Sequence, residues 1–182
     1  MYTPRLTKPV QPNKYYFSSI NKYYATGKYG MPNCVAYAYG RFMEVMNQDS
    51  CSLSTGNAED WYPHRDRYDR NAKIPLEGAI MCWYGVGSKS GHVAVVEKVN
   101  SDGTVVTSES AWKGSFWYSK IRKAGSNGNW GMPTSGYRFQ GFIYNPKGGE
   151  GASPYGLVGS STPGIQGVKS AVYTLSNLVW TP

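Results

Sequence analysis

Two residues of the 182-residue chain have the types and surroundings that nucleophilic catalysis needs, Cys34 and His92. Cys34 follows a Gly-Met-Pro-Asn turn signal, and apolar residues then recur at steps of three and four, which predicts a helix from about Cys34 to Met46. The positive end of the helix dipole favours a thiolate in the first turn. His92 opens the run HVAVVEKV, which predicts a buried strand over 92–99. Such a pair can attack a carbonyl carbon and then protonate the leaving group.

A third candidate, Glu109, lies on the strand that follows His92. The turn signal at 100–103 separates HVAVVEKV from TVVTSE and predicts a β-hairpin. A loop of two or four residues places Glu109 on the face of His92, and with four residues the two are diagonal neighbours about 7 Å apart between backbones. A loop of three residues would bring Ser108 or Ser110 there instead. The loop length therefore decides the third member of the site.

Short helices followed by strands must position these residues. The tyrosine-rich stretch 13–29 permits a short helix, and GNAEDWYPHRDRYDR suits another that is capped by Asn57 and ends before Pro63. Strands are predicted over 79–84, 92–99, 104–109, 116–122 and 137–144, with a glycine-rich loop at 124–135 placed to overhang the site. The predicted fold class is α+β, with N-terminal helices packed on an antiparallel sheet of about five strands.

Composition divides the chain into four parts. Residues 1–12 contain three prolines and no periodicity, which predicts an extended arm, and residues 13–146 carry the periodic patterns of a single domain. Residues 147–164 are rich in Gly, Ser and Pro and are interpreted as a linker. Residues 165–182 are interpreted as a C-terminal tail or the start of a further element.

The remaining cysteines do not suggest a metal site. Three cysteines without CxxC spacing argue against a zinc site and against a disulfide framework. Cys82 lies in an apolar run and is predicted to be a buried core thiol, while Cys51 follows the first helix in a polar loop. His64 lies in a polar stretch and is predicted to be exposed.

Other candidate site groups surround the pair. The backbone N–H of Cys34 at the helix N-terminus is a natural oxyanion donor, and the side chain of Asn33 is either a second donor or the helix cap. Four aromatic residues fall on segments expected to border the cleft and are candidate platforms for a sugar or a peptide, with core packing as the alternative: Trp83, Tyr84, Trp112 and Trp130.

The chain is basic. A formal charge of +8 and a pI near 9.3 imply an acidic partner or surface, for which nucleic acid is one candidate and a merely solubilising charge the alternative, since the basic residues form no run. No stretch approaches the roughly 20 apolar residues that cross a bilayer. The N-terminal sequence MYTPRLTKPVQPNKYY lacks the apolar core of a secretory signal.

Four segments in order resemble the CHAP domain (cysteine, histidine-dependent amidohydrolase/peptidase). They are PNCVAYAYGRF around Cys34, GNAEDWY at 56–62, GAIMCWYGVGSKSGH at 78–92 with the HVAVV that follows, and GFIYNP at 141–146. The similarity covers residues 13–146. It implies a papain-like fold with Cys34 as nucleophile and His92 as base, and it selects Glu109 as the residue that orients His92.

Two departures from the family pattern concern the site. Members often carry an amide residue two positions after the acidic one, but this chain has Ala111, so a fourth polar member is missing or supplied elsewhere. Some relatives bind calcium just before the cysteine, whereas the segment from Asn13 to Asn33 contains no Asp or Glu. No metal and no cofactor are therefore expected.

The resemblance implies a peptidoglycan hydrolase, either a cysteine endopeptidase or an N-acetylmuramoyl-L-alanine amidase. A phage lysin acting on Gram-positive walls fits the pattern, as an endolysin released from the host cytoplasm at lysis or as part of a virion tail with other tail proteins. The basic charge then suits anionic wall polymers, and nucleic acid is not favoured. Two alternatives stay open: a catalytically silent module that binds cell wall or nucleic acid, and a papain-like hydrolase with a non-wall amide substrate.

Overall fold

The computed structural model describes residues 2–149 of the chain. Within these residues the helices are α1 (Lys14–Phe17), α2 (Lys22–Ala25) and α3 (Cys34–Met46), followed by the 3-10 turn η1 (Ala58–Asp60). The strands are β1 (Arg70–Asn71), β2 (Ile80–Gly85), β3 (His92–Val99), β4 (Val105–Glu109), β5 (Tyr118–Arg122) and β6 (Tyr137–Ile143). Most of the predicted linker and all of the predicted tail lie outside the described residues.

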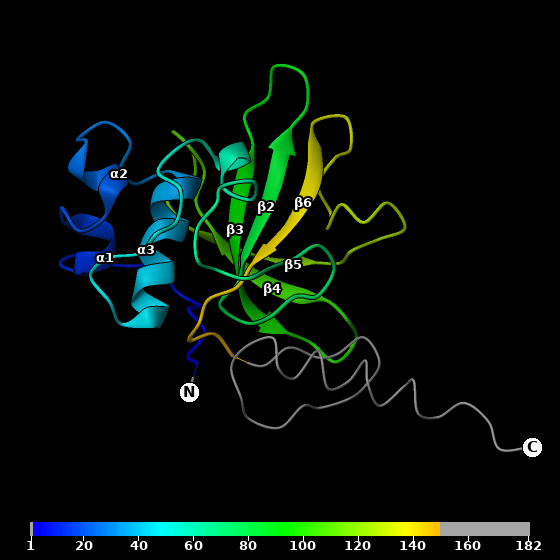
Figure 1. Ribbon diagram of the computed structural model, residues 1–182, viewed down its shortest axis with the longest axis horizontal. Coiled ribbons are helices and arrows are strands. Elements are labelled where there is room, and N and C mark those ends of the chain that lie inside the picture. The colour runs from blue at the N-terminus through cyan, green and yellow to red at the C-terminus, as the bar shows by residue number, and fades with distance from the viewer. Residues whose placement is uncertain (1, 150–182) are drawn as a thin grey trace, which may run out of the picture.

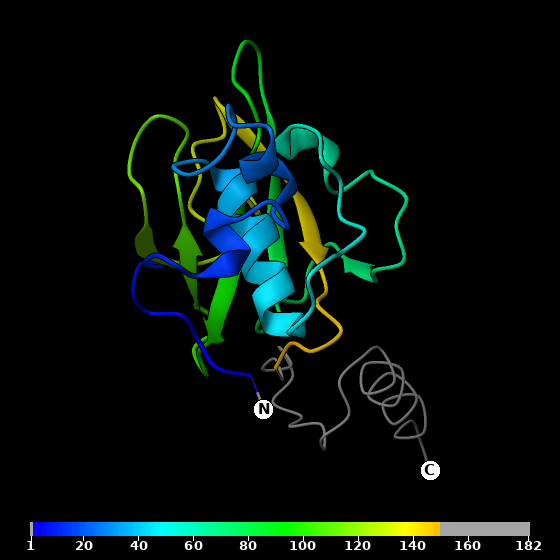
Figure 2. The same cartoon turned by 90° about the vertical axis from the view of Figure 1, so that its left-hand side faces the viewer.

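The strands of the described part form one antiparallel sheet in the order β1-β6-β2-β3-β4-β5. Figure 1 shows the three helices gathered on one side of this sheet, and Figure 2 shows α3 lying across its face. The predicted α+β class is confirmed. Within residues 2–149 the sheet has six strands rather than about five, because the two-residue β1 pairs with the end of β6.

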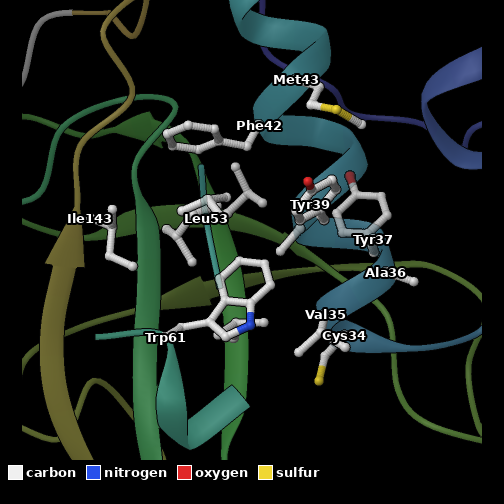
Figure 3. Packing of buried hydrophobic residues seen from close by; sticks show 14 of the residues in the cluster. Cys34, Val35, Ala36, Tyr37, Tyr39, Phe42, Met43, Leu53, Trp61 and Ile143 are labelled. Carbon is white, nitrogen blue, oxygen red and sulfur yellow. The ribbon is translucent and has the colours of Figure 1, made fainter. Parts of the chain in front are cut away.

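Helix α3 is the central element of the core beneath the helices. It runs from Cys34 to Met46, as its periodicity predicts, and ends at Asn47, whose φ of 52° is the left-handed conformation that terminates helices. Figure 3 shows Cys34 at one end of the buried row along this helix. The helix packs against apolar side chains of three strands: Ile80, Cys82, Val93, Val95 and Ile143.

Two predicted helices differ from the structure. The stretch after Asn57 forms only the three-residue turn η1, because Pro63 leaves little room and disfavours helical conformation at the residue before it. The tyrosine-rich stretch 13–29 forms two separate turns instead of one helix. Each has its own capping side chain, Asn13 for α1 and Asn21 for α2, so each turn starts anew.

The opposite face of the sheet carries a second core. The indole Nε1 of Trp83 donates to the carbonyl of Asn129 at 3.1 Å, and the Asn129 side chain accepts from the Phe139 backbone at 2.7 Å. Trp130 packs into the same cluster. These contacts hold the glycine-rich loop 124–135 against the sheet.

A buried ionic cluster fixes the start of the N-terminal arm. The Glu97 carboxylate pairs with Arg41 of α3 at 2.9 Å and accepts from the Tyr2 hydroxyl at 2.5 Å and the Arg5 backbone at 2.7 Å. Arg5 in turn pairs with Glu44. This Glu97 cluster lies toward the C-terminal half of α3, away from Cys34.

Candidate active site

Cys34 is the first residue of α3 and is 9% exposed. The Asn33 side chain caps this helix: its oxygen accepts from the Val35 backbone at 3.2 Å, and its amide group donates to the Tyr29 carbonyl at 2.9 Å. Asn33 therefore has the capping role, the second of its two predicted roles. Backbone N–H groups in a first helical turn have no acceptor within the helix, so helix geometry leaves the Cys34 N–H available to an oxyanion.

The β3–β4 hairpin turns through three residues, 101–103. The Asn100 N–H donates to the Thr104 carbonyl at 2.8 Å, and Gly103 has a φ of 81°. Continued in a regular ladder, this loop would place Ser108 and Ser110 on the face of His92. The loop length alone would therefore place a serine on the face of His92 and not Glu109.

A β-bulge at Glu97 reverses this outcome. Lys98 pairs with Val106 whereas Val96 pairs with Thr107, which leaves Glu97 as the extra residue. Beyond the bulge the register has shifted by one, and Glu109 lies on the face of His92 as its diagonal neighbour. Of the loop lengths left open, the structure has three residues, and the bulge restores the proximity of Glu109 and His92.

His92 contacts both other members of the predicted set. Its Nε2 lies 2.8 Å from Oε2 of Glu109, and hydrogen bonding and attraction to Cys34 are among the causes that raise its pKa. Burial acts to lower the pKa of His92, but these hydrogen bonds and the attraction to both groups outweigh it and raise the pKa from 6.5 to about 9. The structure therefore favours an imidazolium between Cys34 and Glu109 at neutral pH.

Glu109 is completely buried and is held by two further side chains. Arg122 donates from Nε to Oε1 at 2.9 Å and from a terminal nitrogen to Oε2 at 2.8 Å, and the Thr107 hydroxyl donates to Oε1 at 2.5 Å. Burial acts to raise the pKa of Glu109, yet the hydrogen bonds and charges of His92 and Arg122 lower it well below its usual range. Glu109 is therefore a stable anion.

The sequence analysis missed Arg122 and Thr107. Thr107 could have been found from the sequence, because side chains alternate along β4 and Thr107 therefore lies on the same face as Glu109. Arg122 carried no such signal. It pairs in register with Val105 at the far end of β4, and its long side chain runs back along the strand to reach Glu109.

The four candidate platform residues divide into two groups. Trp83 and Trp130 are buried in the second core, with exposures of 0% and 5%, so the alternative of core packing holds for both. Trp83 belongs to β2, and Trp130 joins the same cluster from the glycine-rich loop 124–135. Tyr84 and Trp112 are exposed, and Trp112 lies against a residue that the sequence analysis missed, Tyr29, with ring centroids 5.7 Å apart.

The other singled-out residues lie outside the site. Cys82 is fully buried, as predicted, and burial raises the pKa of its thiol. Cys51 is partly buried, with its pKa also raised by burial, and His64 is exposed, as predicted. Residues 2–149 contain no cluster of three His, Cys, Asp or Glu side chains that could hold a metal ion. In the same range no helix is long and apolar enough to span a bilayer.

Comparison with known proteins identifies the segment that carries these residues. Residues 22–111 match the family model of the CHAP domain. A curated N-acetylmuramoyl-L-alanine amidase domain-containing protein of Staphylococcus aureus is 36% identical over 89 residues, covering 44% of this chain and 14% of that protein. A crystal structure described as an N-acetylmuramoyl-L-alanine amidase from Staphylococcus aureus matches with 34% identity and a TM-score of 0.41, over 50% of this chain and 28% of its own.

The chain thus spans only a small part of the length of both relatives. The matched segment begins in α2 and ends two residues after Glu109, so it includes Cys34, His92 and Glu109. The match identifies residues 22–111 of this chain as a CHAP domain.

Proposed function

We propose that residues 13–146 form the catalytic domain of a peptidoglycan hydrolase that cleaves an amide bond of the bacterial cell wall. The observation that carries the proposal is the buried His92, which bonds to Glu109 at 2.8 Å and interacts with Cys34 at the start of α3. A silent binding module has no need of a buried imidazole with a raised pKa between a thiol and a carboxylate. The curated relative, an N-acetylmuramoyl-L-alanine amidase domain-containing protein by name, supports the cell wall as the substrate.

In the first half of the proposed reaction, the Cys34 thiolate attacks the carbonyl carbon and forms a C–S bond. The oxyanion of the tetrahedral intermediate accepts a hydrogen bond from the Cys34 backbone N–H. His92 then gives its proton to the leaving amine as the C–N bond breaks, which yields a thioester. Because Nε2 is bonded to Glu109, Nδ1 is the ring nitrogen left for this transfer.

In the second half, the neutral His92 takes a proton from water, which attacks the thioester carbonyl. The C–S bond breaks, the product leaves as a carboxylic acid, and the sulfur returns as a thiolate beside the imidazolium. Glu109 stays charged throughout, fixes the ring orientation and stabilises the imidazolium. Each step uses only protein side chains and water.

The finer assignment is a phage lysin acting on Gram-positive walls, as a cysteine endopeptidase or an N-acetylmuramoyl-L-alanine amidase. The charge of +8 supports attraction to anionic wall polymers, which raises the encounter rate at low ionic strength. Mass spectrometry of purified virions would separate a tail component from a free endolysin. The cleaved bond lies in the stem peptide, the cross-bridge or the sugar–peptide junction.

The direct test compares the native protein with Cys34→Ala on purified Gram-positive walls. We expect the native protein to clear the walls in a zymogram and in suspension, and the variant to be inactive although folded. New amino termini and muropeptide masses identify the bond, since an amidase releases free L-alanine termini and intact glycan. Clearing by Cys34→Ala would exclude the proposed mechanism.

A further inference from the structure

Three side chains supply four hydrogen bonds to the two oxygens of the Glu109 carboxylate. A carboxylate offers about four lone-pair sites. Arg122 and Thr107 occupy those on Oε1, and His92 and a second Arg122 nitrogen occupy those on Oε2. A rotation of Glu109 away from His92 would break the bidentate pair with Arg122. The orientation that His92 needs is therefore enforced from the opposite side of the carboxylate.

Contacts with groups other than Glu109 also hold the Arg122 side chain in place. It is only 2% exposed, its guanidinium carbon lies 4.9 Å from the centroid of the Trp83 ring, and it donates to the Trp130 carbonyl at 3.2 Å. The Trp83 ring and the Trp130 backbone thus hold the guanidinium beside Glu109.

On this geometry we propose that Arg122 is a positioning residue of the active site, which holds Glu109 in line with His92. The proposal rests on the proposed function for its effect on turnover, but not for its effect on His92. Arg122 and His92 are cations that share one oxygen of Glu109. Arg122 thus fixes the geometry of Glu109 and also competes with His92 for its charge.

The charged and titratable groups around the pair are few, which makes the competition measurable. His92 faces Cys34 of α3 and Glu109 of β4. Glu109 faces His92, Arg122 and Tyr118, the last from β5. Removing the charge of Arg122 leaves His92 as the only cation on Glu109, so His92 should hold its proton to higher pH.

The experiment is an NMR titration of the imidazole nitrogens, combined with wall hydrolysis, on the whole chain. The protein has two histidines, and the exposed His64 serves as an internal reference for His92. In Arg122→Gln we expect the His92 midpoint to move upward by about one pH unit. We expect the rate of hydrolysis per folded molecule to fall by about 100-fold, because a displacement of about 1 Å at a catalytic group costs that much.

Two further variants separate charge from geometry. Arg122→Lys keeps the charge but cannot bond both oxygens, so the His92 midpoint should stay while the rate falls. Thr107→Val removes only one donor to Oε1, and should lower the rate modestly without moving the midpoint. If Arg122→Gln does not fold, these two variants still decide the question, because unchanged rates in both would refute the positioning role.

A matched control is Arg41→Gln, which breaks a comparably buried Arg–Glu pair in the Glu97 cluster. It should lower the melting temperature without changing the His92 titration. Equal titrations of His92 in native protein, Arg122→Gln and Arg41→Gln would overturn the proposal and leave Arg122 a purely structural residue. Walls left intact by the native protein would contradict the proposed function instead, and the titration would still test Arg122.

A double-mutant comparison tests whether Arg122 acts through Glu109. Once Glu109 is replaced by Gln, the orientation that Arg122 enforces no longer exists. Arg122→Gln should then cause little further loss of rate, so the two effects should be strongly non-additive. Full additivity of the two losses would contradict the proposal.

Discussion

The Nε2 atom of His92 lies 2.8 Å from Oε2 of Glu109, and this contact decides which ring nitrogen serves Cys34. With Nε2–H donated to a buried anion, the second proton of the imidazolium resides on Nδ1. That proton is the one that passes to the leaving amine. The Glu109 contact therefore sets both the tautomer and the direction of proton transfer.

The raised pKa of His92 predicts how activity and stability depend on pH. Protonated His92 contributes stability that is complete below its ordinary pKa of 6.5 and is lost as the pH rises through about 9. Hydrolysis should fall over the same alkaline range, because His92 loses there the proton that it gives to the leaving amine. Parallel pH series of wall hydrolysis and melting temperature test this, and an activity loss already complete near pH 6.5 would contradict it.

Cys34→Ala provides the matching control for that pH series. The hydrogen bond and charge of Cys34 are among the causes that raise the pKa of His92. Their removal should shift the alkaline loss of stability to lower pH. An unchanged stability profile would show that Glu109 alone holds the proton on His92.

The three cysteines should differ sharply in reactivity. Iodoacetamide should label Cys34 faster than Cys51 and Cys82, because burial raises the pKa of both other thiols and Cys82 is completely enclosed. Labelling of Cys34 should abolish hydrolysis in proportion to its extent. Peptide mapping after partial modification measures both, and activity that survives complete labelling of Cys34 would exclude it as the nucleophile.

Glu109→Gln should reduce hydrolysis strongly, by up to the order of 10⁴ where an orienting carboxylate fixes the tautomer. Glu109→Ala should also destabilise the fold by about 3–5 kcal/mol, because it leaves the buried Arg122 unpaired. Kinetics and thermal unfolding of both variants separate the two effects.

Glu59→Gln is the control for this substitution. Its carboxylate accepts from the Gly91 backbone at 2.8 Å, next to His92, and a glutamine oxygen can keep that bond. It should retain nearly full activity. If Glu59→Gln were as slow as Glu109→Gln, orientation of His92 could not be assigned to Glu109 alone.

The sequence predicted the elements that depend on local periodicity better than the pairing between them. Helix α3 and strand β3 begin at Cys34 and His92 as predicted, since their apolar patterns are long. Loop length left the third member of the site open, because nothing in the local sequence announces the bulge at Glu97 that shifts the register of β4 against β3. Arg122 was missed for the same reason: its role exists only through tertiary contacts.

The exposed pair of Tyr29 and Trp112 is the surface on which we expect the substrate to rest. The Tyr29 carbonyl is bonded by Asn33, the residue before Cys34, and Trp112 follows Glu109 by three positions. The contact between the two rings therefore connects the loop that precedes Cys34 with the segment that follows Glu109. They are 42% and 46% exposed, which is unusual for side chains of this size.

Trp112→Ala should raise KM for soluble wall fragments by about 2- to 10-fold, the range that corresponds to one aromatic contact, with kcat nearly unchanged. A higher KM with an unchanged kcat indicates a contact that is equally strong in the ground state and in the transition state. Trp112→Phe should restore most of the affinity because it keeps an aromatic face. Ile121→Ala is the control, since this side chain on β5 is 72% exposed and has no proposed role. If both alanine variants bind the fragments equally well, or if Trp112→Ala lowers kcat alone, the Tyr29–Trp112 surface does not hold the substrate.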